Sequence, residues 1–269
     1  MFAPFEGPRS LVTRSERHAN ELSDAIKVLQ HKVRIYFVPV GNDGQFEQYF
    51  LQFEPQPPIE LAVILKDAIS NLRSALDIVV CDVARLRNKP ASEMSQVKFP
   101  FGKDEAGLNE AFKRAKLDSD VNKAIRAIHP INGHNVWIRD LHDLDIIAKH
   151  RTVLPVFATA NSRLPFRVPI EMQHAFLSMG VDLANSNCPW TQGSTMTLPK
   201  GVDPRSHFRP RGDMTISLPR ELPFGEKNLE VVLRELRNGV SVTIGFFETL
   251  FGANSDPAVR DPLRAQLGL

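Results

Sequence analysis

The longest hydrophobic pattern in the chain lies between residues 59 and 88. Apolar residues recur there at alternating spacings of three and four, which places them on one face of a helix. This stripe consists of Leu61, Leu65, Ala68, Leu72, Ala75, Val79, Val83 and Leu86. Pro58 suits the first turn of a helix, and Asn88 followed by Pro90 favours its end. We therefore expect one continuous helix with a single apolar face.

Other segments show the same helical period. Thr13 and Glu16 match a capping box, and apolar residues at helical spacing follow, which predicts a helix over 14–30. Further helices are expected at 104–116, 119–128, 136–151 and 227–252. The last of these contains Val, Thr and Gly residues that favour a strand locally, but its apolar positions from Leu229 to Phe251 keep the helical spacing.

Two parts of the chain have the character of β-structure. The turn sequence GNDG separates two runs of β-branched and aromatic residues, which predicts a hairpin of strands at about 32–40 and 45–53. Short β-rich pieces such as STMTL and DMTISL occupy residues 153–220. These pieces indicate an antiparallel sheet with long loops.

These elements together predict an α+β fold in a single domain, 1–269. We expect a bundle of about four main helices, with the 59–88 helix central and the 136–151 and 227–252 helices beside it. The helical core covers 14–152 and includes the hairpin at 32–53, the β-rich insert covers 153–220, and 227–252 is the final bundle helix. Residues 253–269 are expected to form a flexible tail.

Composition narrows the class of protein. Hydrophobic residues make up 42% of the chain and charged residues 24%, as in ordinary globular proteins, and the net charge of +2 gives no global basic field. Cys81 and Cys188 are too few for a disulfide framework, so a reducing compartment is expected. The N-terminal sequence lacks the apolar core of a secretory signal, and no stretch of about 18 apolar residues occurs. We therefore predict a cytoplasmic protein that does not bind a membrane.

Two groups of polar residues border the apolar stripes. In the 59–88 helix, Asp67 and Asn71 are one turn apart and are candidate binding residues, and Arg73 and Asp77 are also one turn apart. The 136–151 helix ends with Lys149, His150 and Arg151, and it also carries His142 and Asp145 on one face with Lys149.

Several interpretations of these groups remain open. The Arg–Asp pair can be an exposed ion pair, and the cationic end can simply complement the helix dipole. Alternatively, Arg73 or Asp77 hydrogen-bonds to a group within Lys149–Arg151, since charges beside a core are rarely left single. Such a network is either a structural clasp or a site with perturbed pKa values.

The motifs LKDAISNLRSALDIVV, FPF and LHDLDIIAKHR, followed by a C-terminal helix, resemble a widespread bacterial protein family that has no assigned activity. Members show G-D-x-x-x-N-L-R-S-A-L-D-H, then F-P-I, then L-N-x-x-D-K-H-R, a β-rich segment and a last helix. The resemblance spans residues 15–252. The chain departs from the pattern at Lys66, Ile78, Asp145 and Ala148, where the family has Gly, His, Asn and Asp. Two of these departures remove ionisable groups.

A basic segment lies within the β-rich region. In an extended chain, alternate residues share a face, which brings together Arg205, His207, Arg209 and Arg211. Such a face suits phosphate contacts, although an ordinary basic surface loop explains it as well. No metal-ligand spacing, phosphate-binding loop or nucleophile elbow is present in the sequence, so we expect neither a metal nor a cofactor.

Two functions follow as hypotheses. The first is a non-enzymatic binding protein of accessory or defence type, with RNA or another protein as its partner. The second is a metal-independent ribonuclease analogous to HEPN domains. It would use Arg73, Asp77, Lys149, His150 and Arg151, with His150 as the acid/base. HEPN domains carry an Arg and a His separated by four to six residues, and this chain has no such pair, because Arg139–His142 and Arg14–His18 are too close.

Overall fold

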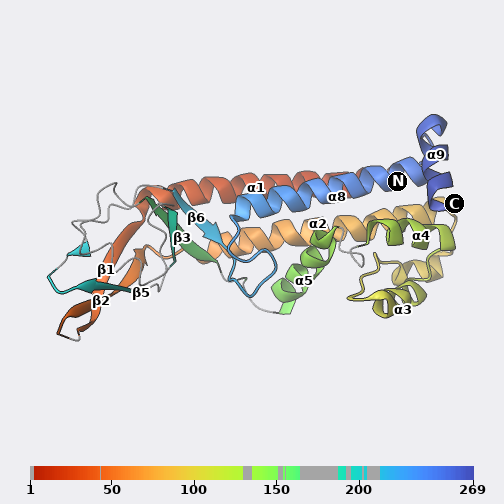
Figure 1. The fold of residues 1–269 in the computed structure, drawn as a ribbon. Coiled ribbons are helices and arrows are strands. Elements are labelled where there is room, and N and C mark those ends of the chain that lie inside the picture. Colours follow the sequence, from red (N-terminus) through yellow and green to blue (C-terminus); the bar gives the residue numbers. More distant parts are fainter. Residues whose placement is uncertain are drawn as a thin grey trace.

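The structure is a computed structural model that describes residues 3–42, 44–129, 135–150, 154, 156–163, 187–191, 195–201, 203–204 and 213–269. In this part of the chain the fold is α+β, with eight helical segments and two three-stranded sheets. The sheets lie at one end of the long helices, and both chain ends lie at the other (Figure 1).

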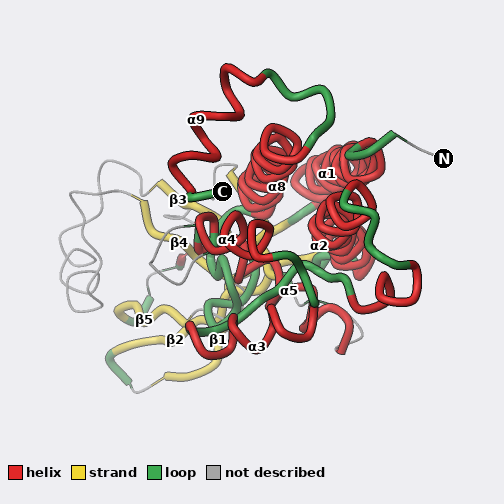
Figure 2. The backbone as a smooth tube through the Cα atoms, turned by 90° about the vertical axis from the view of Figure 1, so that its right-hand side faces the viewer, coloured by secondary structure: helices red, strands yellow, loops and turns green. Residues whose placement is uncertain are grey.

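Three long helices form the body of the molecule. They are α1 (Glu6–Lys32), α2 (Ile59–Leu86) and α8 (Leu229–Phe251), and each contacts the other two. Viewed along their axes, the three helices form a bundle (Figure 2). The amino end of α1 lies beside the carboxyl end of α2. At this place the Phe5 backbone N–H donates a hydrogen bond to Asp82 Oδ2 at 2.9 Å.

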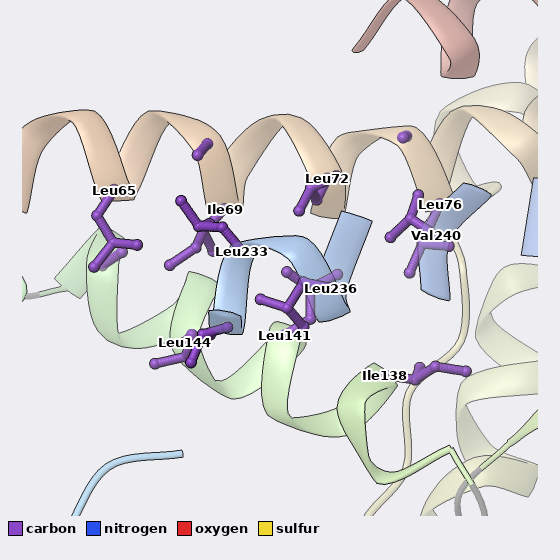
Figure 3. Close-up of a cluster of buried hydrophobic side chains, with 14 of the residues drawn as sticks. Leu65, Ile69, Leu72, Leu76, Ile138, Leu141, Leu144, Leu233, Leu236 and Val240 are labelled. Atoms are coloured by element: carbon purple, nitrogen blue, oxygen red, sulfur yellow. The ribbon is translucent and has the colours of Figure 1, made fainter. Parts of the chain in front are cut away.

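The apolar stripe of α2 forms the centre of the core, and the buried face is wider than predicted. Ile69, Leu76 and Val80 are buried in addition to the stripe, whereas Leu86 at its end is only partly buried. Leu65, Ile69, Leu72 and Leu76 are fully buried. Figure 3 shows them facing residues of α8 and of α5 (Val136–His150). The residues opposite are Leu233, Leu236 and Val240 on α8, and Ile138, Leu141 and Leu144 on α5. The expected adjacency of α2 and α5 is therefore confirmed.

One glycine allows α5 to pack closely on α8. A Cβ atom at Gly239 would lie 2.5 Å from the ring of Trp137, well inside van der Waals contact. Trp137 belongs to the first turn of α5, so this contact fixes the amino end of that helix against the body.

The remaining helices are short and gather toward the end away from the sheets (Figure 1). They are the 3-10 helix η1 (Ala91–Gln96), α3 (Glu105–Ala115), α4 (Ser119–Ile128) and α9 (Pro257–Leu267). The expectation of about four main helices was wrong, because three helices have more than 20 residues and α5, the next, has 15.

Two helix boundaries also differ from the expectation. The first helix begins at Glu6 and not at residue 14, and Thr13 does not cap it, because its hydroxyl donates to the Arg9 carbonyl within the helix. The expectation of a flexible tail at 253–269 is wrong for Pro257–Leu267, which form α9. The Asp256 side chain accepts from the Ala258 N–H, and Pro257 occupies the first turn, so this helix has a proper start.

The strands form two antiparallel sheets. The first has the order β1 (Arg34–Asn42), β2 (Phe46–Glu54), β5 (Thr195–Pro199), and the second has the order β4 (Asn187–Thr191), β3 (Phe157–Arg163), β6 (Asp213–Ser217). The predicted hairpin is confirmed, and the 153–220 segment is β-rich where it is described. This segment does not form one separate sheet, however, because β5 pairs with β2 of the hairpin. None of the described helices combines the length and the apolar composition that a membrane span requires.

Candidate functional site

Polar side chains from α2 and α5 meet beside the core, together with the segment that follows η1. We call this group the α2–α5 cluster. It consists of Ser70, Arg73, Asp77, Phe101, His142, Asp145 and Lys149. The helical period explains the location, because these residues on α2 and α5 flank the apolar stripes that pack the two helices together.

Arg73 and Asp77 form an ion pair one turn apart on α2. Arg73 Nη1 lies 2.7 Å from Asp77 Oδ2, but it is off the hydrogen-bonding direction, so the attraction is mainly that of the two charges. Asp77 Oδ1 also accepts a hydrogen bond from the Phe99 backbone N–H at 2.8 Å. Arg73 is 8% exposed, so its charge depends on these neighbours for compensation.

An aromatic ring connects this pair to α5. The Arg73 guanidinium carbon lies 4.2 Å from the centre of the Phe101 ring, a cation–π contact. The His142 ring stacks on the same phenyl ring, with 4.1 Å between centroids and 5° between planes. Arg73 Nε is 3.5 Å from His142 Nδ1 and donates to it. Burial, and then the Arg73 guanidinium, lower the pKa of His142 below its ordinary 6.5, which fits an imidazole that accepts from arginine.

Asp145 provides the second link between the helices. It is 2% exposed, and its Oδ1 accepts from the Ser70 hydroxyl on α2 at 3.1 Å. Its Oδ2 accepts from Lys149 Nζ at 2.5 Å. The buried carboxylate is thus paired on both oxygens, as a buried charge needs to be.

The expected bond from Arg73 or Asp77 to Lys149–Arg151 was wrong for the part that the structure describes. Lys149 pairs with Asp145, and the side chain of His150 is exposed at the end of α5. The hydrogen bond from Arg73 goes instead to His142, which lies about two turns before Lys149 on α5. Arg151 lies outside the described residues.

Asp67 and Asn71, two of the weaker binding candidates, are not part of this cluster. Asn71 donates to the Asp67 backbone carbonyl at 2.8 Å within α2, and the Asp67 side chain is exposed. The basic segment of Arg205, His207, Arg209 and Arg211 lies outside the described residues, so the hypothesis of a phosphate-binding face stays a prediction.

Sequence reasoning left out the central ring of the cluster. Phe101 was part of the FPF motif, but a phenylalanine in a connector carries no sign of where its ring packs. His142 and Asp145 were recognised on one face with Lys149, and the i,i+4 spacing of Asp145 and Lys149 did indicate their ion pair. Ser70 gave no signal beyond its place in the middle of a helix.

The chemical capacity of the cluster is limited by its internal pairing. Each of its carboxylates accepts a hydrogen bond from within the chain and lies in an ion pair. Among the residues that the structure describes, no group of three or more His, Cys, Asp and Glu side chains is placed to hold a metal ion.

Comparison with known proteins adds no assignment. No protein family model, no curated protein and no solved structure matches the chain. The resemblance to the bacterial family with the NLRSALDH-type motif therefore stays a prediction.

Proposed function

We propose that the protein is a non-enzymatic binding protein of accessory type, and that the α2–α5 cluster is a structural clasp. The clasp fixes α5 and the 99–101 segment on α2. A rigid helical body then carries the β-rich end, through which the protein binds its partner. We further propose that the protein is bacterial and cytoplasmic, and that its partner is RNA or another protein.

The observation that carries this proposal is the internal pairing of the cluster. Arg73 is matched by Asp77, and Asp145 is matched by Ser70 and Lys149. Arg73 and Asp145 are 8% and 2% exposed, so they are poorly placed to reach a substrate. A network whose buried charges are paired within the chain favours a role in fixing helix register, and one buried nitrogen of this network, Arg73 Nη1, makes no hydrogen bond.

The alternative ribonuclease needs a histidine that is both accessible and held beside a second catalytic group. His142 is half-buried and accepts from Arg73, while His150 is exposed and lies about two helical turns beyond His142 on α5. Neither histidine combines the two requirements, which is why the binding role is the better supported of the two.

The test is an RNA-cleavage assay with purified full-length protein and a fluorescent single-stranded RNA, with EDTA present to remove contaminating metal-dependent nucleases. We expect no cleavage above that of a buffer control. Cleavage by the wild type that disappears in His150→Ala or His142→Ala, with the melting temperature unchanged, would overturn the proposal in favour of the ribonuclease.

A further inference from the structure

A groove runs along the seam between the first half of α1 and the last half of α2. Its volume is about 1150 Å³. On the α1 side it extends from the start of the helix to Arg17, which corresponds to roughly 18 Å of helix length. Among the described residues, these two helices and the residues just before α1 line it, and Figure 2 shows α8 beside α1.

The floor of the groove is apolar. Pro4, Leu11, Ile78 and Leu86 line it, and the last three side chains are partly exposed. Gly7 widens the groove at its amino end, because a Cβ there would already touch Ile78 at 3.5 Å. An elongated apolar floor between two helices suits the apolar face of a third helix.

Arginines line the rim, and they fall into two kinds. Arg9 pairs with Glu248 of α8, and Arg85 pairs with Asp82 at 2.7 Å, so both charges are used within the chain. Arg14 and Arg17 are exposed, lie three residues apart on one face of α1, and have no ion-pair partner among the described residues. The lining also holds two carboxylates. Asp82 is buried, pairs with Arg85 and accepts from the Phe5 backbone N–H, whereas Glu6 is exposed and accepts only from the Ala3 backbone N–H among the described residues.

We propose that this groove binds an acidic amphipathic helix of a partner protein. The apolar face of that helix packs on Leu11 and Ile78, and its carboxylates pair with Arg14 and Arg17. The charge balance supports this occupant, because four arginines and two carboxylates line the groove, which leaves positive charge in excess. The shape supports it as well, because an open trough of about this length matches three to four helical turns.

This site is separate from the α2–α5 cluster. The groove lies on α1 and the carboxyl half of α2, whereas the cluster faces α5. The inference goes beyond the proposed function, since it adds a second binding surface and names the class of its partner. It does not depend on whether the cluster is structural or catalytic.

The test uses three designed peptides of 15 residues, each held helical by a hydrocarbon staple, because a free helix of this length is marginal in water. The first has leucines at helical spacing and glutamates elsewhere. The second replaces glutamate by lysine, and the third keeps the glutamates but replaces leucine by serine. Binding to the full-length protein is measured by fluorescence anisotropy. We expect the first peptide to bind, and the other two to bind at least tenfold more weakly.

The site is located with a matched pair of double variants. Arg14→Gln/Arg17→Gln should weaken binding of the first peptide roughly tenfold, as expected for the loss of two partly exposed ion pairs. Arg139→Gln/Arg234→Gln removes two other exposed arginines and the same total charge. It should leave the affinity unchanged, and thermal melts should show both variants folded.

Four results would overturn the inference. They are failure of the first peptide to bind, equal binding of the serine peptide, equal loss in both double variants, and tighter binding of a 20-nucleotide RNA through Arg14 and Arg17. Self-association that buries these arginines, seen by sedimentation, would assign the groove to a second copy instead. None of these results bears on RNA cleavage, so failure here is distinguishable from failure of the proposed function.

Discussion

Arg73 on α2 and Arg14 on the adjacent α1 lie in two contrasting environments. In the α2–α5 cluster, Arg73 is 8% exposed and its charge is matched by Asp77. On the α1–α2 groove, Arg14 is exposed and has no ion-pair partner in the described part of the chain. Both arginines border a hydrophobic surface. The difference teaches that the proximity of charges to apolar residues does not by itself indicate function, whereas burial and pairing separate a structural role from a binding role.

The energetic consequences of the two environments are opposite in direction. A buried ion pair contributes little net stability when intact, but loss of one partner leaves an uncompensated charge and costs several kcal/mol. An exposed, unpaired arginine contributes almost nothing to folding, so its removal affects only what binds to it. Each prediction below compares a change in the interior with a matched change at the surface.

The largest effect is expected at the shared core beneath the cluster. Leu72→Asp places an unpaired charge in a fully buried position of α2 and should destabilise the fold by more than about 4 kcal/mol. The control is Val63→Asp on the same helix, where the side chain is 46% exposed. Circular dichroism melts should show the first variant unfolded and the second close to wild type. An unchanged melting temperature for Leu72→Asp would mean that the face of α2 that carries Leu72 is not the buried one.

The second comparison tests the two arginines directly. Arg73→Met keeps most of the apolar stem but leaves Asp77 without its cation and removes the contact over Phe101. We expect a loss of about 2 kcal/mol, below the range for fully buried pairs because the Asp77 side chain is 30% exposed. Arg14→Met should change stability by less than about 0.5 kcal/mol. Urea denaturation of both variants measures the difference, and equal losses would remove the distinction between the two regions.

The pH dependence of stability tests the environments of His129 and His142. Burial lowers the pKa of His129 to about 4, and also lowers the pKa of His142. Both pKa values lie below the ordinary 6.5, so the unfolded state binds more protons than the folded state between the folded pKa and 6.5. Stability is therefore full above about pH 6.5 and falls as the pH drops toward the folded pKa.

The size of this effect follows from the His129 shift. Between pH 7 and pH 5, His129 should contribute a loss of about 1–2 kcal/mol, since one pKa unit corresponds to about 1.4 kcal/mol. His129→Asn and His142→Asn should each reduce the loss. Urea denaturation at the two pH values measures these losses. The expectation fails if His129→Asn loses as much stability as the wild type.

Helix existence could be predicted from the sequence because the apolar period of α2, α5 and α8 is long and regular. The start of α1 could not, because Phe5 ends the preceding segment with a positive φ of 67° and anchors in the core. Helix α9 was missed because none of its residues is buried, so no apolar stripe marks it. Its capping residues, Asp256 and Pro257, were the available signal.

The site was predicted only to the level of local spacing. The i,i+4 pairs Arg73–Asp77 and Asp145–Lys149 follow from helix geometry, and both are present. The contact between the helices depends on how far α5 is shifted along α2, and that shift is set by tertiary packing, such as Trp137 against Gly239. For this reason His142, and not Lys149 or His150, meets Arg73. The pairing of β5 with β2 has the same origin, because it joins segments that lie far apart in the sequence.

A double-mutant cycle on Arg73 and His142 tests the central claim most directly. The claim is that these residues form a structural clasp between α2 and α5. Arg73→Met and His142→Ala should each destabilise the protein. The double variant should lose less than the sum, with a coupling of about 1 kcal/mol, as is typical of residues in contact. The matched cycle of Asp77→Ala with the exposed His150→Ala should be additive. Additivity in the first cycle, or coupling in the second, would contradict the account.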